Sequence, residues 1–273
     1  MSLGVVVKGP EGIALAADTR VTVASQRGDG PEISVNFDNA TKLLRFDKPH
    51  KWVAAVTYGI AVIGTRTAHS FMPEFGLTLG NKRLSICQYA KRLSDFFNRQ
   101  WEGLGIPSQE SATGSMTFIV GGYDAEKPYG TVFLFTIPDS PDPQPRNLDG
   151  FGMTWGGQLQ IASRIIHGFD PNLLELLRQE FNLSDSQTQK FANALRQNLA
   201  YTIPYSVLPL QDCVDLATFL IRTTMTAQNL AVGSRGVGGA IDVATITRRD
   251  GLKWVQKKRI RGENRHVRPN LNH

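Results

Sequence analysis

The chain has 273 residues, of which 41% are hydrophobic and 20% charged, an ordinary composition for a globular protein. This length suits one large domain or a domain with a sizeable insertion. No apolar run reaches the roughly 18 residues of a membrane span, and residues 1–17 lack the basic start and unbroken apolar run of a signal peptide. The composition therefore predicts a cytoplasmic protein with no membrane association.

The net charge of +6 comes entirely from the C-terminal end of the chain. Residues 253–273 hold seven Lys or Arg and one acid, whereas residues 1–252 are balanced. A solvated tail explains this pattern. The alternatives are a tail that docks on an acidic partner and a tail that makes weak nucleic-acid contacts.

Apolar strands and turn residues alternate through the first third of the chain. Strands are expected at residues 3–8, 13–18, 41–46 and 51–59, a loop or loose hairpin at 24–39, and a loop near 76–81. The first two strands are joined by the turn sequence GPEG. The next two form a hairpin around Lys48, Pro49 and His50.

The rest of the chain combines segments of helical periodicity with four further strands. Helices are expected at residues 86–101, from about 157, and at 171–181, 185–200 and 211–229, and strands at 116–121, 130–137, 240–247 and 252–256. Ser85 is a candidate cap for the first of these helices. The prolines of residues 138–146 predict a loop. This order predicts an α+β domain of two antiparallel sheets with helices packed on them.

The sequence lacks the common motifs for metal and nucleotide binding. The five His are scattered, and no HExxH, CxxC or phosphate-binding loop occurs, so no metal and no cofactor are expected. Cys87 and Cys213 fall in helical patterns and are interpreted as buried free thiols. The sequence GSRGVGG at 233–239 is interpreted as a plain turn, with an anion cradle as the alternative.

Ser2 follows the initiator methionine, and a small residue there is the usual context for removal of Met1. Ser2 would then carry both a hydroxyl and a free α-amine, whose pKa of about 7.7 to 8.0 suits a general base. Together they form a complete nucleophilic unit. An ordinary N-terminus is the alternative.

Three short motifs follow Ser2 along the chain, and their order and spacing carry information: DTRVT at 18–22, TK at 41–42 and AVTYG at 55–59. This arrangement resembles the proteasome β-subunit superfamily of N-terminal-nucleophile hydrolases, which includes HslV and the bacterial homologue Anbu. The order of elements agrees over most of residues 2–256, and the sequence looks closest to the Anbu-like branch. The resemblance implies a four-layer α-β-β-α sandwich of two antiparallel sheets flanked by helices.

The same resemblance implies catalytic roles for Ser2, Asp18, Lys42 and Gly59. Ser2 would be the nucleophile, Lys42 would assist it, Asp18 would orient Lys42, and the Gly59 N–H would stabilise the oxyanion. A carboxylate at the end of an apolar strand is costly unless it is paired, which fits an Asp18–Lys42 pair. A salt bridge without a catalytic role is the alternative.

Val21, Thr22 and Thr57 are the expected substrate-binding residues. The implied function is a peptidase that cleaves peptides or unfolded proteins and assembles into a ring or helical homo-oligomer. The alternatives are a non-catalytic scaffold subunit that keeps Met1 and an amidase acting on small molecules.

The sequence departs from the family pattern in several places. The nucleophile is Ser where proteasomes mostly have Thr. The late family motif D-x-x-S-G-G falls on a stretch containing Ser234, Val237, Gly238 and Gly239, which lacks the motif's Asp and Ser, and a further family Ser falls on Gly157. The expected domain spans residues 1–256 with a helical insertion at about 168–208, followed by a basic tail at 257–273.

Overall fold

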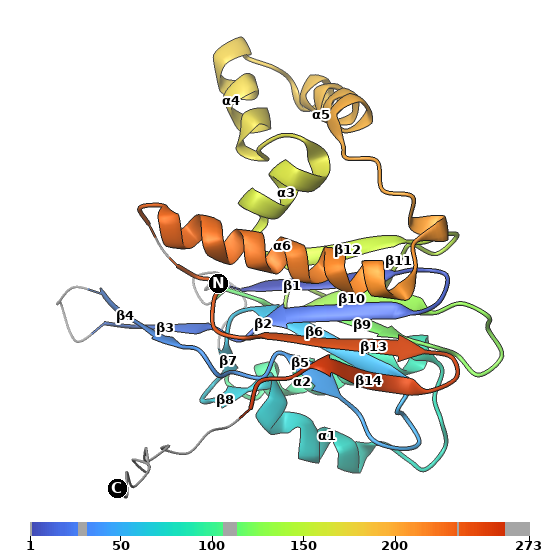
Figure 1. The fold of residues 1–273 in the computed structure, drawn as a ribbon. Coiled ribbons are helices and arrows are strands. Elements are labelled where there is room, and N and C mark those ends of the chain that lie inside the picture. The colour runs from blue at the N-terminus through green and yellow to red at the C-terminus, as the bar shows by residue number, and fades with distance from the viewer. Residues whose placement is uncertain (1, 27–31, 106–113, 234, 260–273) are drawn as a thin grey trace, which may run out of the picture.

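Two five-stranded antiparallel sheets lie face to face in the computed structural model, which describes residues 2–26, 32–105, 114–233 and 235–259 (Figure 1). The first sheet consists, in order, of β12 (Gly152–Gly157), β1 (Leu3–Lys8), β2 (Ile13–Asp18), β13 (Ile241–Thr247) and β14 (Gly251–Gln256). The second consists of β11 (Ser140–Arg146), β10 (Thr131–Ile137), β9 (Met116–Gly122), β6 (Val53–Gly59) and β5 (Leu43–Arg45). Two hairpins complete the strands: β3 (Val21–Gln26) with β4 (Glu32–Phe37), and β7 (Val62–Ile63) with β8 (Arg66–Thr67).

Helices cover the outer face of each sheet. The helices are α1 (Met72–Thr78), α2 (Ile86–Glu102), α3 (Leu159–His167), α4 (Asn172–Phe181), α5 (Asp185–Leu199) and α6 (Leu210–Leu230), with short 3-10 helices η1 (Ala68–Phe71) and η3 (Tyr205–Val207). α3 and α6 pack on the first sheet, and α1 and α2 pack on the second. The expected α+β fold of four layers, α-β-β-α, is confirmed.

The central strands are apolar because both of their faces are covered. Every residue of β1 (LGVVVK) and β2 (IALAAD) is buried, between α6 on one side and the second sheet on the other. Such strands read as continuous apolar runs rather than alternating ones. Asp18 is the one carboxylate in this pair of strands, and it closes β2.

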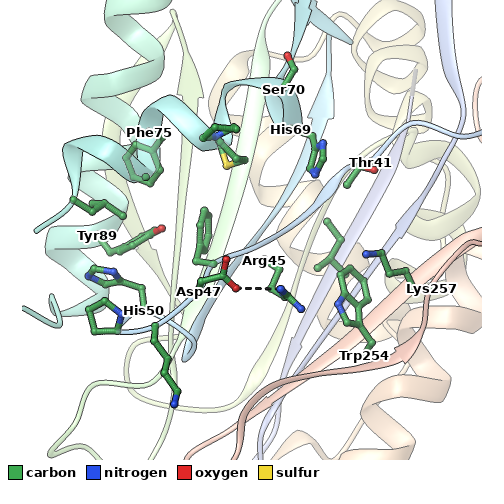
Figure 2. Close-up of a pocket in the computed structure, with 18 of the residues that line it drawn as sticks. Thr41, Arg45, Asp47, His50, His69, Ser70, Phe75, Tyr89, Trp254 and Lys257 are labelled. Carbon is green, nitrogen blue, oxygen red and sulfur yellow. Dashed lines mark hydrogen bonds and ion pairs between the residues drawn. The ribbon is translucent and has the colours of Figure 1, made fainter. Parts of the chain in front are cut away.

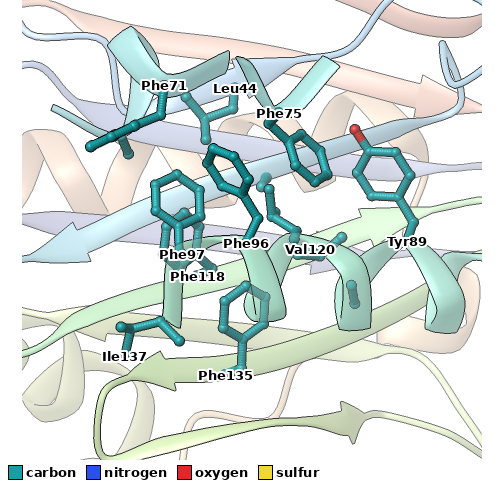
Figure 3. Close-up of a cluster of buried hydrophobic side chains, with 14 of the residues drawn as sticks. Leu44, Phe71, Phe75, Tyr89, Phe96, Phe97, Phe118, Val120, Phe135 and Ile137 are labelled. Atoms are coloured by element: carbon teal, nitrogen blue, oxygen red, sulfur yellow. The ribbon is translucent and has the colours of Figure 1, made fainter. Parts of the chain in front are cut away.

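Aromatic side chains fill the layer between α2 and the second sheet (Figure 3). The rings of Phe97 and Phe118 lie 4.6 Å apart between centroids, and those of Phe118 and Phe135 4.9 Å apart. α2 begins at a capping box in which Ser85 and Gln88 each bond to the backbone of the other. This local signal sets the start of the helix that the sequence predicted.

Three expectations were wrong. Residues 138–146 contain β11, an edge strand that among the described residues pairs with β10 alone; proline is tolerated there because the missing N–H faces away from the sheet. The loop expected near 76–81 is partly helical, because α1 runs to Thr78. Cys87 is exposed on α2, whereas Cys213 is buried as expected.

α4 and α5 occupy the region where a helical insertion was expected, and they stand apart from the sandwich (Figure 1). α4 has no buried side chain, and α5 buries only Ala192.

At the C-terminal end of the chain, β14 stops at Gln256, and most of the basic tail, residues 260–273, lies outside the described residues. Within the described part of the chain, no helix is long and apolar enough to cross a membrane.

Candidate active site

Asp18 is the centre of a hydrogen-bond network at the end of β2. Its side chain is 0% exposed. Oδ1 accepts from the Leu3 N–H (3.0 Å) and from Lys42 Nζ (2.8 Å), and Oδ2 accepts from the N–H groups of Arg20 (3.2 Å) and Gly238 (3.1 Å). Four donors therefore satisfy a carboxylate that burial alone would destabilise.

Lys42 immediately precedes β5, and its side chain is only 7% exposed. Its ammonium donates to Asp18 and to the carbonyl oxygen of Arg20. Burial lowers the pKa of Lys42, the charge of Asp18 opposes this, and the charges of Lys258 and Arg20 lower it further. The result is a fixed ammonium that is more acidic than an exposed lysine.

Ser2 is 5% exposed and lies directly before β1. Its carbonyl oxygen accepts from the Gln158 N–H (2.7 Å), and the next N–H, of Leu3, is held by Asp18. Ser2 and Lys42 line the same small cavity, of about 20 Å³, which has room for a single water. Met1, whose removal was predicted, lies outside the described residues.

Two of the expected substrate-binding residues also line this cavity, namely Val21 and Thr57. The Thr57 N–H donates to the Lys42 carbonyl oxygen at 2.9 Å, so β6 fixes the backbone of Lys42. The cavity wall is completed by residues that the sequence did not single out: Ala40, Thr41, Tyr58, Ile60, Ala61, Thr67 and Ala68.

Gly59 and Thr22 do not line the cavity. Gly59 has φ +96°, and a Cβ there would lie 2.1 Å from the carbonyl oxygen of Ser115, so the end of β6 requires glycine. It sits between Tyr58 and Ile60, which both face the cavity. Thr22 instead donates from Oγ1 to Asn36 Oδ1 across the β3–β4 hairpin (2.7 Å).

Tyr58 is a large side chain that lines the small cavity and was not predicted as a site residue from the sequence. A Cβ on Gly156 would lie 2.1 Å from the Tyr58 hydroxyl oxygen, and one on Gly4 would lie 3.2 Å from its ring. Burial raises the pKa of Tyr58, so its hydroxyl stays protonated. The available signal was a glycine in each of two apolar strands, which marks a close neighbour.

The glycine-rich loop that was expected to be a plain turn also supports the site. Gly238 donates to Asp18, and a Cβ on it would lie 2.4 Å from the guanidinium carbon of Arg20. Arg20 is held by Asp38 through two bonds of 2.6 and 2.8 Å. Backbone N–H groups therefore support Asp18, although the motif that the resemblance implies for this loop is incomplete; Ser234 lies outside the described residues.

The structure requires glycine at position 157, where the resemblance led us to expect a serine. Its φ is +105°, and a Cβ there would lie 1.9 Å from the Ser2 carbonyl oxygen. A serine at this position would need a different backbone path. In the described parts of the chain, no three His, Cys, Asp or Glu side chains converge in a way that could hold a metal ion.

Comparison with known proteins identifies the fold. No protein-family model and no curated protein matches the sequence. Two solved structures are similar: a mutant of Anbu from Hyphomicrobium sp. strain MC1 (TM-score 0.54, 16% identity, covering 95% of this chain and 87% of that one) and Anbu, the ancestral beta-subunit, from Yersinia bercovieri (0.53, 14%, 93% and 88%). The chain has an Anbu-like, proteasome-related fold.

The Anbu-like fold brings together residues from three separate stretches of sequence. Ser2 precedes β1, Asp18 ends β2, and Lys42 precedes β5 of the other sheet. The site therefore lies where the two sheets of the sandwich meet at one end, and it depends on how the sheets stack.

Proposed function

We propose that the protein is a peptidase of the N-terminal-nucleophile type, with Ser2 as the nucleophile after removal of Met1. One observation carries the proposal: Ser2 and Lys42 line one cavity while Asp18, fully buried, holds the Lys42 ammonium at 2.8 Å. A scaffold subunit needs none of this arrangement. The Anbu-like fold supports the proposal.

In the proposed reaction, Ser2 Oγ attacks the carbonyl carbon of a peptide bond, and the free α-amine of Ser2 takes the hydroxyl proton. The tetrahedral intermediate collapses as the C–N bond breaks, and the amine returns the proton to the leaving nitrogen. Water then hydrolyses the ester to Ser2 and releases the second product. The same amine serves as base and then as acid.

The neighbouring groups have electrostatic roles in this proposal. The Lys42 ammonium favours the developing alkoxide of Ser2. Asp18 keeps that ammonium charged and oriented. The N–H of Gly59 is the proposed oxyanion donor, an interaction that contributes about 2.7–4 kcal/mol in other enzymes.

The proposed substrates are peptides or unfolded proteins. Val21 and Thr57 line the cavity beside Ser2, and Thr22 follows Val21 on β3. We propose that the β3 backbone aligns an extended substrate. An amidase acting on small molecules is the alternative, and a panel of short peptides tested against simple amides separates the two: turnover of the amides alone would favour the amidase.

The test is the intact mass of the purified protein before and after treatment with a peptide epoxyketone. The hydroxyl adds to the ketone and the amine opens the epoxide, so the adduct adds the whole mass of the reagent. We expect loss of Met1 and a single stoichiometric adduct. Ser2→Ala should lose the adduct, whereas Ser140→Ala, at an exposed serine on β11, should keep it.

The opposite result is equally clear. Retention of Met1 with no adduct would overturn the peptidase proposal and leave a non-catalytic scaffold subunit, with Asp18 and Lys42 as a structural ion pair. A thermal melt of Ser2→Ala that matches the wild type shows that loss of the adduct is not loss of folding.

We also propose that the chain self-associates. One similar structure is described as a beta-subunit, and α4 and α5 carry exposed apolar side chains: Leu176, Phe181, Phe191 and Leu199. Native mass spectrometry tests this. Phe181→Ser should shift the protein toward the monomer, whereas Leu77→Ser, at an exposed apolar position on α1, should not. A monomeric wild type would contradict the proposal.

A further inference from the structure

A second and much larger cavity, of about 840 Å³, lies between the β5–β6 connection, the η1–α1 segment and the end of β14 (Figure 2). Thr41 lines both this cavity and the small one beside Ser2. Its volume is that of a site for a small organic molecule. Nothing in the proposed peptidase chemistry uses it.

The walls of this cavity combine rings with positive charge. Phe46, Phe75, Tyr89 and Trp254 provide aromatic surface. The charged residues that line it are Arg45, Lys48, Lys257, Lys258 and the acid Asp47. The lining therefore holds four cationic side chains and one carboxylate beside the aromatic rings.

Internal pairing neutralises only part of this charge. Arg45 bonds to Asp47 (3.1 Å), and Lys258 bonds to the buried Asp242 (2.6 Å). No ion pair within the described residues involves Lys48 or Lys257. Lys257 instead lies over the Trp254 ring, 5.0 Å from its centroid. The cavity keeps a surplus of positive charge.

Two hydrogen-bond donors in the wall are unsatisfied. Tyr89 Oη and Trp254 Nε1 are buried atoms without a hydrogen-bond partner among the described residues. Burial raises the pKa of Tyr89 well above its usual range, so its hydroxyl remains a donor. Buried polar groups are normally bonded, and each exception asks for an explanation. A bound ligand with acceptor oxygen atoms would explain why these donors have no partner within the protein.

His69, one of the two histidines in this wall, lies within reach of the charges of the two lysines. Burial lowers the pKa of His69, and the positive charges of Lys258 and Lys257 lower it further. In Figure 2 His69 lies opposite Trp254 and Lys257, across the cavity. Their field therefore acts inside the cavity, and it favours an anion there.

We propose that this cavity binds a small organic anion with an aromatic body. The anionic group lies beside Lys257 and the Trp254 N–H, and the ring packs against Phe46 and Phe75. The oxygen atoms accept from the Trp254 N–H, which has no partner among the described residues, and the aromatic body packs on the rings of the wall. This site is independent of the peptidase proposal.

The test uses 8-anilinonaphthalene-1-sulfonate, an aromatic anion whose emission rises in apolar sites, with the full chain. We expect saturable binding of one equivalent. Lys257→Glu should weaken binding by about tenfold or more, because it replaces an attraction by a repulsion. Lys190→Glu, the same charge change on α5, should leave the dissociation constant unchanged.

Competition identifies the chemistry that is recognised. Benzoate should displace the probe, whereas neutral benzamide and inorganic phosphate should not. Equal binding by wild type and Lys257→Glu would overturn the proposal, since the probe would then sit elsewhere, such as on α4 and α5. Equal competition by benzamide would exclude recognition of the charge, and displacement by phosphate alone would exclude the aromatic requirement.

Discussion

The two cavities, which share Thr41 in their walls, differ in whether their buried polar groups have hydrogen-bond partners. Beside Ser2, the carboxylate of Asp18 has four donors, and the ammonium of Lys42 has two acceptors. In the larger cavity, Tyr89 and Trp254 have no hydrogen-bond partner within the described residues. The first arrangement is complete within the protein, as the proposed catalytic role requires, whereas the second leaves donors open for the proposed anion.

The difference has a structural origin. Asp18 ends a central strand, where backbone N–H groups from three other segments converge on it. The larger cavity is lined by side chains from β5, the β5–β6 connection, η1, α1, α2 and the end of β14 with the residues just after it. If this contrast is right, changes in the first site should cost stability, and changes in the second should not.

The largest effect is expected for Asp18→Asn. The variant leaves the buried Lys42 ammonium without its counter-charge, which should lower the free energy of unfolding by about 3–5 kcal/mol. Urea denaturation measures this. Asp142→Asn is the control, because Asp142 is 78% exposed and its bond to Lys91 is a surface pair worth at most about 1 kcal/mol. Similar losses for the two variants would break the comparison.

Gly156→Ala tests how tightly Tyr58 closes the smaller cavity. The new Cβ would lie 2.1 Å from the Tyr58 hydroxyl oxygen, and such overpacking should cost about 1–3 kcal/mol. Adding Tyr58→Phe, which removes that oxygen, should restore part of the loss. Gly150→Ala has open space around its Cβ and should change little. A neutral Gly156→Ala would mean that Tyr58 is not held as described.

His50, which lines the larger cavity, should make the stability of the protein depend on pH. Burial lowers the pKa of His50, so between that pKa and about 6.5 the unfolded chain binds more protons than the folded one. The free energy of unfolding should therefore fall as the pH drops below about 6.5, by at most about 1.4 kcal/mol per pH unit. His50→Gln should flatten this slope in urea titrations from pH 7 to 5; an unchanged slope would contradict the assignment.

The smallest effect is expected for Lys48→Ala. Lys48 is exposed and lines the larger cavity, so its removal should change the free energy of unfolding by less than about 0.5 kcal/mol. Thermal denaturation of the variant beside the wild type measures this. A loss comparable to that of Asp18→Asn would show that the pocket cations are structural and would remove the contrast between the cavities.

Local patterns predicted much of the fold. The capping box at Ser85 set the start of α2, and continuous apolar runs marked β1 and β2. These signals lie in neighbouring residues, because hydrogen bonds at a helix end and burial along a strand involve residues close in sequence. β11 was missed because whether its prolines are tolerated depends on its edge position.

The residues of the candidate site were predicted from the resemblance, whereas their positions relative to one another depend on the tertiary structure. The sequence by itself determined that a buried carboxylate, Asp18, would need a partner. Gly238 donates to it from 220 residues away because β13 pairs with β2 in the same sheet. That Lys42 reaches Asp18 and that Tyr58 closes the cavity follow only from the stacking of the two sheets. The same holds for the larger cavity, whose aromatic and cationic walls come from segments about 200 residues apart and meet only in the folded chain.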